Sequence, residues 1–181
     1  MKKILLFILI LSMGCAPWVQ VGGLYKMESH NYSVELPQGW MRWNKGDQLL
    51  ITRDGVPLQN IQIVRQNIDE PLKHTKKKLS KTMLPQEAAE VILDNVASNN
   101  DISEFAIVEN TPLTINGMSG FKAIYSYKTK DGLKVKSVYC GVIQDQWFYG
   151  INYNAPERHY FDKDIKTFEN VLESFKLIKT A

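Results

Sequence analysis

The second half of the chain is a run of short segments in which apolar and polar residues alternate. In residues 121–128, four apolar residues spaced two apart fall on one face. A period of two is typical of strands that are buried on one side. Asn116-Gly117 and Asp131-Gly132 separate such segments, and both dipeptides favour tight hairpin turns. The pattern predicts an antiparallel meander, with strands at 105–109, 113–115, 121–128, 133–143 and 147–153.

The first half predicts further strands, and helical spacing follows them. The strands are expected at 32–36, 49–53 and 60–65, with Pro37-Gln38-Gly39 as a turn. Residues 85–98 predict a helix, because Pro85 suits the first helical position and the apolar residues form one face. A terminal helix is expected at 158–174, and a weak, exposed helix at 71–82. The fold class is therefore α+β, an antiparallel sheet with helices packed on it.

The first fifteen residues, MKKILLFILILSMGC, read as an export signal. Lys2 and Lys3 precede an apolar run that is far shorter than the roughly 20 residues of a membrane-spanning helix. The cysteine that follows this run resembles the lipobox of bacterial lipoproteins, although Ser12 and Met13 depart from its usual residues. That resemblance implies lipidation of Cys15 and attachment to the membrane by acyl chains, palmitate among them.

Length and charge set further bounds. Residues 1–14 are assigned to the signal peptide, 15–29 to the lipidated cysteine and a loosely ordered tether, and 30–181 to one domain. Without Lys2 and Lys3, the chain has 20 basic and 19 acidic residues. This balance argues against nucleic acid as a partner, because such proteins usually carry a clear basic excess.

Three segments resemble the PsbP/Mog1-like superfamily. They are YSVELPQGW at Tyr32–Trp40, the Asn116-Gly117 hairpin, and ESFK at Glu173–Lys176. The resemblance spans about residues 30–178 and implies an α/β/α sandwich in which an antiparallel sheet lies between helices. It also implies that Trp40 caps an edge of the core and that Phe175 ties the last helix to the sheet. Members of the superfamily act as assembly factors, regulators and binding modules, which favours a non-enzymatic role.

Residues that could support catalysis are scattered. His30, His74 and His159 have no other ligand at metal-binding spacing, so no metal or cofactor is expected. Cys140 lies in the middle of a predicted strand, which favours a small buried thiol over a nucleophile. Ser119 belongs to a hairpin and lacks the sequence of a nucleophile elbow. Asp162 and Asp164 are expected to face the N-terminal dipole of the last helix.

One uneven charge feature remains, a lysine cluster in the weak helix. Its members are Lys73, Lys76, Lys77, Lys78 and Lys81. The cluster is either a solvated surface, or a patch that rests on anionic lipid or docks an acidic partner.

These observations predict a lipid-anchored, non-catalytic binding or assembly module in the periplasm, with an unknown protein partner. Ala16 is not the aspartate that typically retains lipoproteins in the inner membrane, so the periplasmic leaflet of the cell outer membrane is favoured. Two alternatives stay open. One is a carrier that holds a small apolar ligand between sheet and helix. The other is a small hydrolase that uses Cys140 or Ser119.

Overall fold

The structure is a computed structural model, and it describes residues 17–178. The helices are α1 (Pro85–Ala97) and α2 (Tyr160–Ser174), with a short 3-10 helix at Glu28–His30. The strands are β1 (Trp18–Met27), β2 (Tyr32–Trp43), β3 (Leu49–Thr52), β4 (Asn60–Asn67), β5 (Ile102–Ile115), β6 (Met118–Thr129), β7 (Lys134–Gln144), β8 (Trp147–Pro156) and β9 (Lys176–Leu177). In this part of the chain, no helix is both long and apolar enough to cross a membrane.

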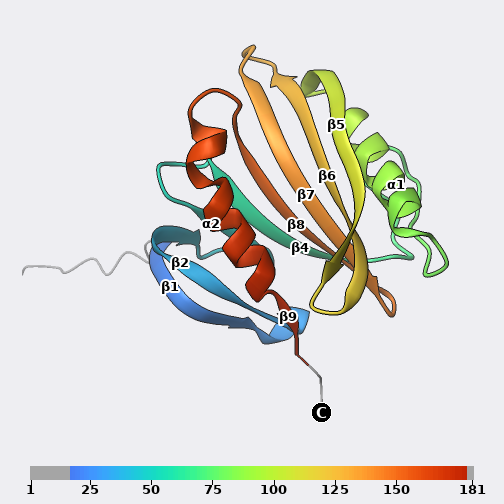
Figure 1. Ribbon diagram of the computed structural model, residues 1–181, viewed down its shortest axis with the longest axis horizontal. Coiled ribbons are helices and arrows are strands. Elements are labelled where there is room, and N and C mark those ends of the chain that lie inside the picture. The colour runs from blue at the N-terminus through green and yellow to red at the C-terminus, as the bar shows by residue number, and fades with distance from the viewer. Residues whose placement is uncertain (1–16, 179–181) are drawn as a thin grey trace, which may run out of the picture.

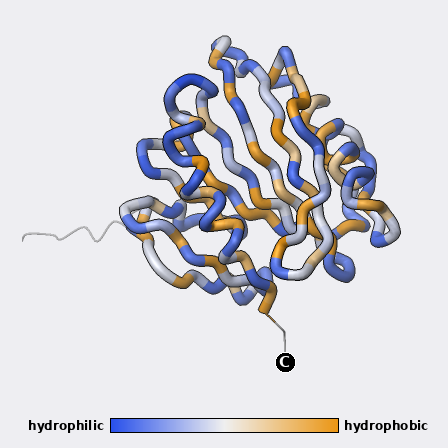
Figure 2. Tube along the Cα trace, viewed as in Figure 1, coloured by the Kyte–Doolittle hydropathy of each residue, from blue (hydrophilic) through white to orange (hydrophobic). Residues whose placement is uncertain are grey.

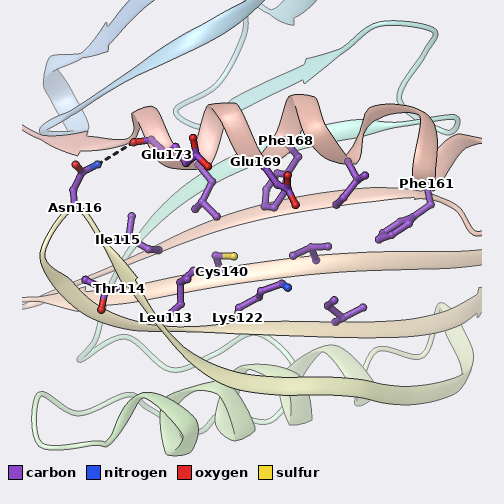
Figure 3. Close-up of a pocket in the computed structure, with 14 residues that line it drawn as sticks. Leu113, Thr114, Ile115, Asn116, Lys122, Cys140, Phe161, Phe168, Glu169 and Glu173 are labelled. Carbon is purple, nitrogen blue, oxygen red and sulfur yellow. Dashed lines mark hydrogen bonds between the residues drawn. The ribbon is translucent and has the colours of Figure 1, made fainter.

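All nine strands join one antiparallel sheet. Its order is β1-β2-β3-β4-β8-β7-β6-β5, and β9 pairs with β2. The two helices lie on opposite faces, α2 on one and α1 on the other (Figures 1 and 3). The predicted α+β class and sandwich architecture are confirmed.

The prediction of a loosely ordered tether is wrong for residues 18–27. They form β1, which pairs with β2 along its whole length. The predicted turn at Pro37-Gln38-Gly39 is also wrong, because these residues bulge within β2 opposite Gly22. Within the bulge, Gly39 has a φ of 77°, a left-handed conformation that glycine adopts without a steric penalty. The backbone N–H and C=O groups of β1 form hydrogen bonds with β2, which is a separate segment of the chain. The local sequence of residues 18–27 therefore cannot reveal this pairing.

The weak helix expected at 71–82 is absent from the structure. The segment consists of turns and irregular backbone, and Lys76 has a positive φ of 60°. Leu72 and Leu79 are buried and hold the segment against the sheet. The two strands expected at 105–109 and 113–115 are a single strand, β5. Pro112 does not break it, because β5 is at an edge of the sheet, where a missing N–H donor costs little.

Each face of the sheet has its own hydrophobic cluster (Figure 2 shows the hydropathy along the chain). The cluster under α2 contains Trp40 and Phe175, both almost fully buried. The Phe175 ring lies 5.5 Å from that of Tyr32 and 5.9 Å from that of Tyr149, so it ties α2 to the sheet as expected. The other cluster joins α1 and the 68–83 segment to Phe121 and Phe148.

A buried polar network fixes the N-terminal part of α2. Asp164 is 1% exposed, and its Oδ2 accepts hydrogen bonds from Arg53 at 2.8 Å and from Gln59 at 3.3 Å. Asp164 therefore binds a neighbouring turn, whereas Asp162 is exposed in the first helical turn. Beside this network, a hydrogen bond from Lys163 lowers the pKa of Asp54 to about 2. This stabilisation is present above about pH 4 and is lost as the pH falls toward 2.

We expect Asp164→Ala to lower the free energy of unfolding by about 2–3 kcal/mol, because it leaves Arg53 and Gln59 without their shared acceptor. Asp162→Ala, two residues earlier in the same helix, should change it by less than about 0.5 kcal/mol. Urea unfolding at pH 7 measures both values. Equal midpoints for the two variants would contradict a structural role for the network.

Candidate functional site

An apolar groove lies between α2 and the strands β5, β6 and β7 (Figure 3). Its volume is about 430 Å³, which is in the size range of small-molecule sites. The lining residues are Leu113, Thr114, Ile115, Asn116, Lys122, Ile124, Val138, Cys140, Phe161, Ile165, Phe168, Glu169, Leu172 and Glu173. Most are apolar, and several are only partly buried, so the groove exposes a contiguous apolar surface.

The position of α2 explains why the groove exists. The helix packs against β2 and β8, so it leaves the same face of β5, β6 and β7 partly uncovered. Asn116 closes one end, because its side-chain amide donates hydrogen bonds to the carbonyl oxygens of Glu173 and Phe175. At the other end, the Lys136 ammonium lies 4.6 Å from the centre of the Phe161 ring. Both ends of α2 are therefore held while its middle overhangs the groove.

Charged residues stand only at the rim of the groove. Lys122 Nζ lies 3.5 Å from Glu109 Oε1, and both side chains are about one-third exposed. Across the opening, Glu169 is exposed and pairs with Lys166 at 3.0 Å. The groove thus has an apolar floor and a rim that carries both positive and negative charges. Such a site suits an apolar group that is flanked by polar atoms.

Cys140 lies on the floor of this groove as a fully buried free thiol. Burial raises the pKa of Cys140 to about 12, so the thiol stays protonated at neutral pH. No histidine is found among the residues that line the groove. Ser119 lines a different hollow of about 170 Å³ beside the start of α1, on the other face of the sheet. The structure does not bring these two candidate nucleophiles together.

The remaining predicted site residues do not converge. The five lysines of the cluster are exposed on the 71–82 segment, and Lys77 pairs with Asp94 at 2.7 Å. Within residues 17–178, no group of three or more His, Cys, Asp or Glu side chains is placed to hold a metal ion. The lipidation site, Cys15, lies outside the described residues.

Sequence reasoning missed the groove as a set of residues. The sequence predicts a helix at 158–174 and a strand at 113–115, which contain Ile165, Leu172 and Leu113, but it does not predict that these side chains share a groove. Their partial exposure depends on where α2 lies, and no local pattern reports that position. Asn116 was recognised for its turn, which its φ of 47° confirms, but not for its bonds to the end of α2.

The sequence model of the PsbP family matches residues 23–177. The chain belongs to the PsbP family. No curated protein matches this PsbP-family chain by sequence.

Solved structures share the fold of this PsbP-family chain at low sequence identity. Cyanobacterial PsbP from Synechocystis sp. PCC 6803 is 14% identical with a TM-score of 0.58, and the match covers 92% of this chain and 95% of that one. The Ran-binding protein Mog1p of Saccharomyces cerevisiae is 9% identical with a TM-score of 0.60, over 89% and 97% of the two chains. A protein of Bacteroides thetaiotaomicron is 13% identical with a TM-score of 0.52, over 90% of this chain and 48% of that one.

We expect the thiol of Cys140 to be unreactive in the folded protein. In a Cys15→Ser chain, Cys140 is the only thiol. Ellman's reagent at pH 8 should label it only on unfolding, because a buried, protonated thiol is a poor nucleophile. Urea should release one reactive thiol per chain. The Cys15→Ser, Cys140→Ala chain is the blank, and native labelling as fast as that of glutathione would instead favour a reactive cysteine.

Proposed function

We propose that this protein is a membrane-anchored, non-catalytic binding module of the cell envelope, with the groove under α2 as its docking site for a protein partner. The observation that carries the proposal is the groove itself, an apolar surface beside a helix that is fixed at both ends, with charged residues at its rim. Mog1p, which shares this fold, is a Ran-binding protein, and this supports a protein partner for the present chain. The protonated thiol of Cys140 and the absence of histidine from the groove lining favour binding over hydrolysis.

Lipidation of Cys15 would hold the domain close to the membrane. Only Ala16 and Pro17 separate Cys15 from the start of β1, so three extended residues span at most about 11 Å. At this end of the sheet, Trp18 packs edge-on against Trp43, with ring centroids 5.1 Å apart. Tryptophan favours the boundary between lipid and water, so this pair suits a position next to an acylated residue. The periplasmic leaflet of the outer membrane is the proposed location.

The lysine cluster lies far from this anchored end. β1 is at one edge of the sheet, whereas the 71–82 segment packs beside α1 near the opposite edge (Figure 1). A short attachment at Cys15 would bring the β1 edge to the bilayer before the lysines. We therefore assign Lys73, Lys76, Lys78 and Lys81 to an acidic surface of a partner. Lys77 is left out because Asp94 already neutralises it.

A second candidate function is carriage of a small apolar ligand. The volume of the groove favours it, because about 430 Å³ would accept a short hydrocarbon chain. Lys122 at the rim would then face a polar or anionic end of that ligand. The two candidates share one site and differ in the mass of what occupies it.

The anchor is tested by Cys15→Ser. This change should prevent acylation and leave either unprocessed precursor or a product that carbonate washing releases from membranes. Wild-type protein should remain bound, because two or more acyl chains hold a protein stably where one does so only marginally. Fractionation together with palmitate labelling measures the effect. Equal membrane retention and labelling in the variant would show that Cys15 is not the attachment site.

The docking site is tested with a photo-crosslinking residue, benzoylphenylalanine, introduced at Leu113 in living cells. Leu113 is a partly buried residue of the groove. Irradiation should yield a discrete protein adduct, and Leu172→Glu should abolish it by placing a charge in the groove. The same photoreactive residue at Leu84, a leucine that is 63% exposed and does not line the groove, is the matched control.

The mass of the adduct separates the two functions. A shift of several kilodaltons identifies a protein partner, whereas a shift of a few hundred daltons identifies a carried ligand. Equal adducts from Leu113 and Leu84, or an adduct that survives Leu172→Glu, would contradict the groove as the site.

A further inference from the structure

The face of the sheet opposite the groove carries a second site with different chemistry. Two adjoining hollows of about 240 and 270 Å³ lie there, and both are lined by Tyr127 and Asn154. The larger hollow also extends to the turn at Asp131. The smaller one is lined by His74, Asn95, Val96, Asn99, Ile102, Tyr125, Tyr127, Tyr139, Asn152 and Asn154. α1 packs on β5 and β6, so it leaves this part of β8 and β4 without a helix over it.

Amide and hydroxyl groups cross the strands here in a defined row. Asn60 on β4, Asn154 on β8 and Ser137 on β7 are register neighbours. Asn154 Nδ2 donates to Asn60 Oδ1 at 3.1 Å, and Ser137 Oγ donates to Asn154 Oδ1 at 2.6 Å. Asn152 Nδ2 also donates to Asn154 Oδ1, at 3.3 Å. These residues therefore form one continuous hydrogen-bonded network.

The network ends in an oxygen that has no donor. Asn60 Nδ2 donates to the Val56 carbonyl at 2.9 Å, and a carbonyl can only accept. This bond fixes which side-chain atom of Asn60 is oxygen and which is nitrogen. The hydrogen bonds from Asn154 and Asn152 then fix the orientations of those two amides in turn. Asn152 Oδ1 is left buried, and no donor reaches it from the described residues. A buried acceptor without a partner is costly. A hydroxyl or N–H from outside the chain would satisfy it once the partly exposed Asn152 side chain turns toward the hollow that it lines.

Apart from the tyrosines, the ionisable side chains of the lining are His74 in the smaller hollow and Asp131 at the turn that ends the larger one. Among residues 17–178, no lysine, arginine or glutamate lines either hollow. Tyrosines stand beside the amides, and the Tyr139 ring lies across Gly150, where a Cβ would be 2.3 Å from its hydroxyl. Burial raises the pKa of Tyr125 and Tyr139 well above the ordinary value, so both hydroxyls stay neutral donors.

From these observations we infer that the paired hollows bind a neutral sugar chain. Asparagine amides both donate and accept, as ring hydroxyls do, and tyrosine rings pack against the apolar faces of sugars. Anionic lipid or nucleic acid would require cations that this lining lacks. An extended peptide would pair with a free strand edge, whereas β4, β8, β7 and β6 are all paired on both sides. The site is separate from the groove, so neither depends on the other.

The test is saturation-transfer NMR on the full-length protein, in a detergent whose head group is not a sugar. The probes are maltotriose, mannotriose and triacetylchitotriose, with trigalacturonate as the charged comparison. We expect at least one neutral trisaccharide to bind at millimolar concentration and trigalacturonate to bind more weakly. Failure of all three neutral probes, or equal binding of trigalacturonate, would overturn the inference.

Two variants locate the binding. Asn152→Ala removes the unpartnered oxygen, and Tyr127→Ala removes a ring shared by the two hollows while leaving the amide network intact. Each should weaken binding at least about tenfold. Tyr160→Ala, a partly buried tyrosine of α2 on the other face, is the control and should bind as wild type does. Urea midpoints confirm folding of each chain.

Unchanged affinity in Tyr127→Ala, or an equal loss in Tyr160→Ala, would place the sugar elsewhere and overturn the site. Binding of a Ser-Gly-Asn tripeptide but of no saccharide would assign the hollows to peptide and also overturn it. None of these outcomes affects the crosslinking at Leu113. The proposal for the groove and the proposal for the hollows are therefore tested independently.

Discussion

The alternation of side chains along β8 is the constraint on which both faces of the molecule depend. β8 lies in the middle of the sheet, between β4 and β7. Tyr149, Ile151 and Tyr153 point toward α2, and the residues between them point to the other face. Tyr153 is fully buried, and its hydroxyl donates to the carbonyl oxygens of Tyr160 and Phe161. A slip of one residue would exchange the two faces and remove this attachment of α2.

α2 is attached to one part of a sheet face. This attachment determines which side chains the rest of that face exposes. Because the helix is held over β2 and β8, the apolar side chains of β5 to β7 that continue beyond it become the groove. On the other face α1 covers β5 and β6, and the continuation across β7, β8 and β4 becomes the polar hollows. The two uncovered regions differ in chemistry although they share strands. Cys140 and Tyr139 are consecutive residues, yet one lines the groove and the other lines a hollow.

Much of the fold could be predicted because local signals there agree with the tertiary structure. The Asn116-Gly117 and Asp131-Gly132 turns are correct, and positive φ values at Asn116, Gly117 and Gly132 explain why. The helix expected at 85–98 is α1, and the helix expected at 158–174 contains α2. These segments have periodicity and boundary residues that act within a few positions of one another.

The errors occur where distant residues decide the backbone. Gly22-Gly23 looks like a linker, but the chain pairs there with β2, whose bulge accommodates it. The 71–82 segment has helix-forming lysines, but burial of Leu72 and Leu79 and the Asn95 side chain, which accepts from the His74 backbone N–H at 2.8 Å, hold it in turns. The groove and the hollows were missed for the same reason, because each is defined by where a helix stops covering the sheet.

The correction at β1 also changes how an anchored domain would be presented. A fourteen-residue tether would let the domain turn freely, and any surface could meet the membrane. With β1 beginning at Trp18, a lipid on Cys15 would restrict the domain to orientations in which the β1 edge lies nearest the bilayer. β5, at the opposite edge, would then point away from it. The groove borders β5, so its opening would face the aqueous compartment, where a partner protein could reach it.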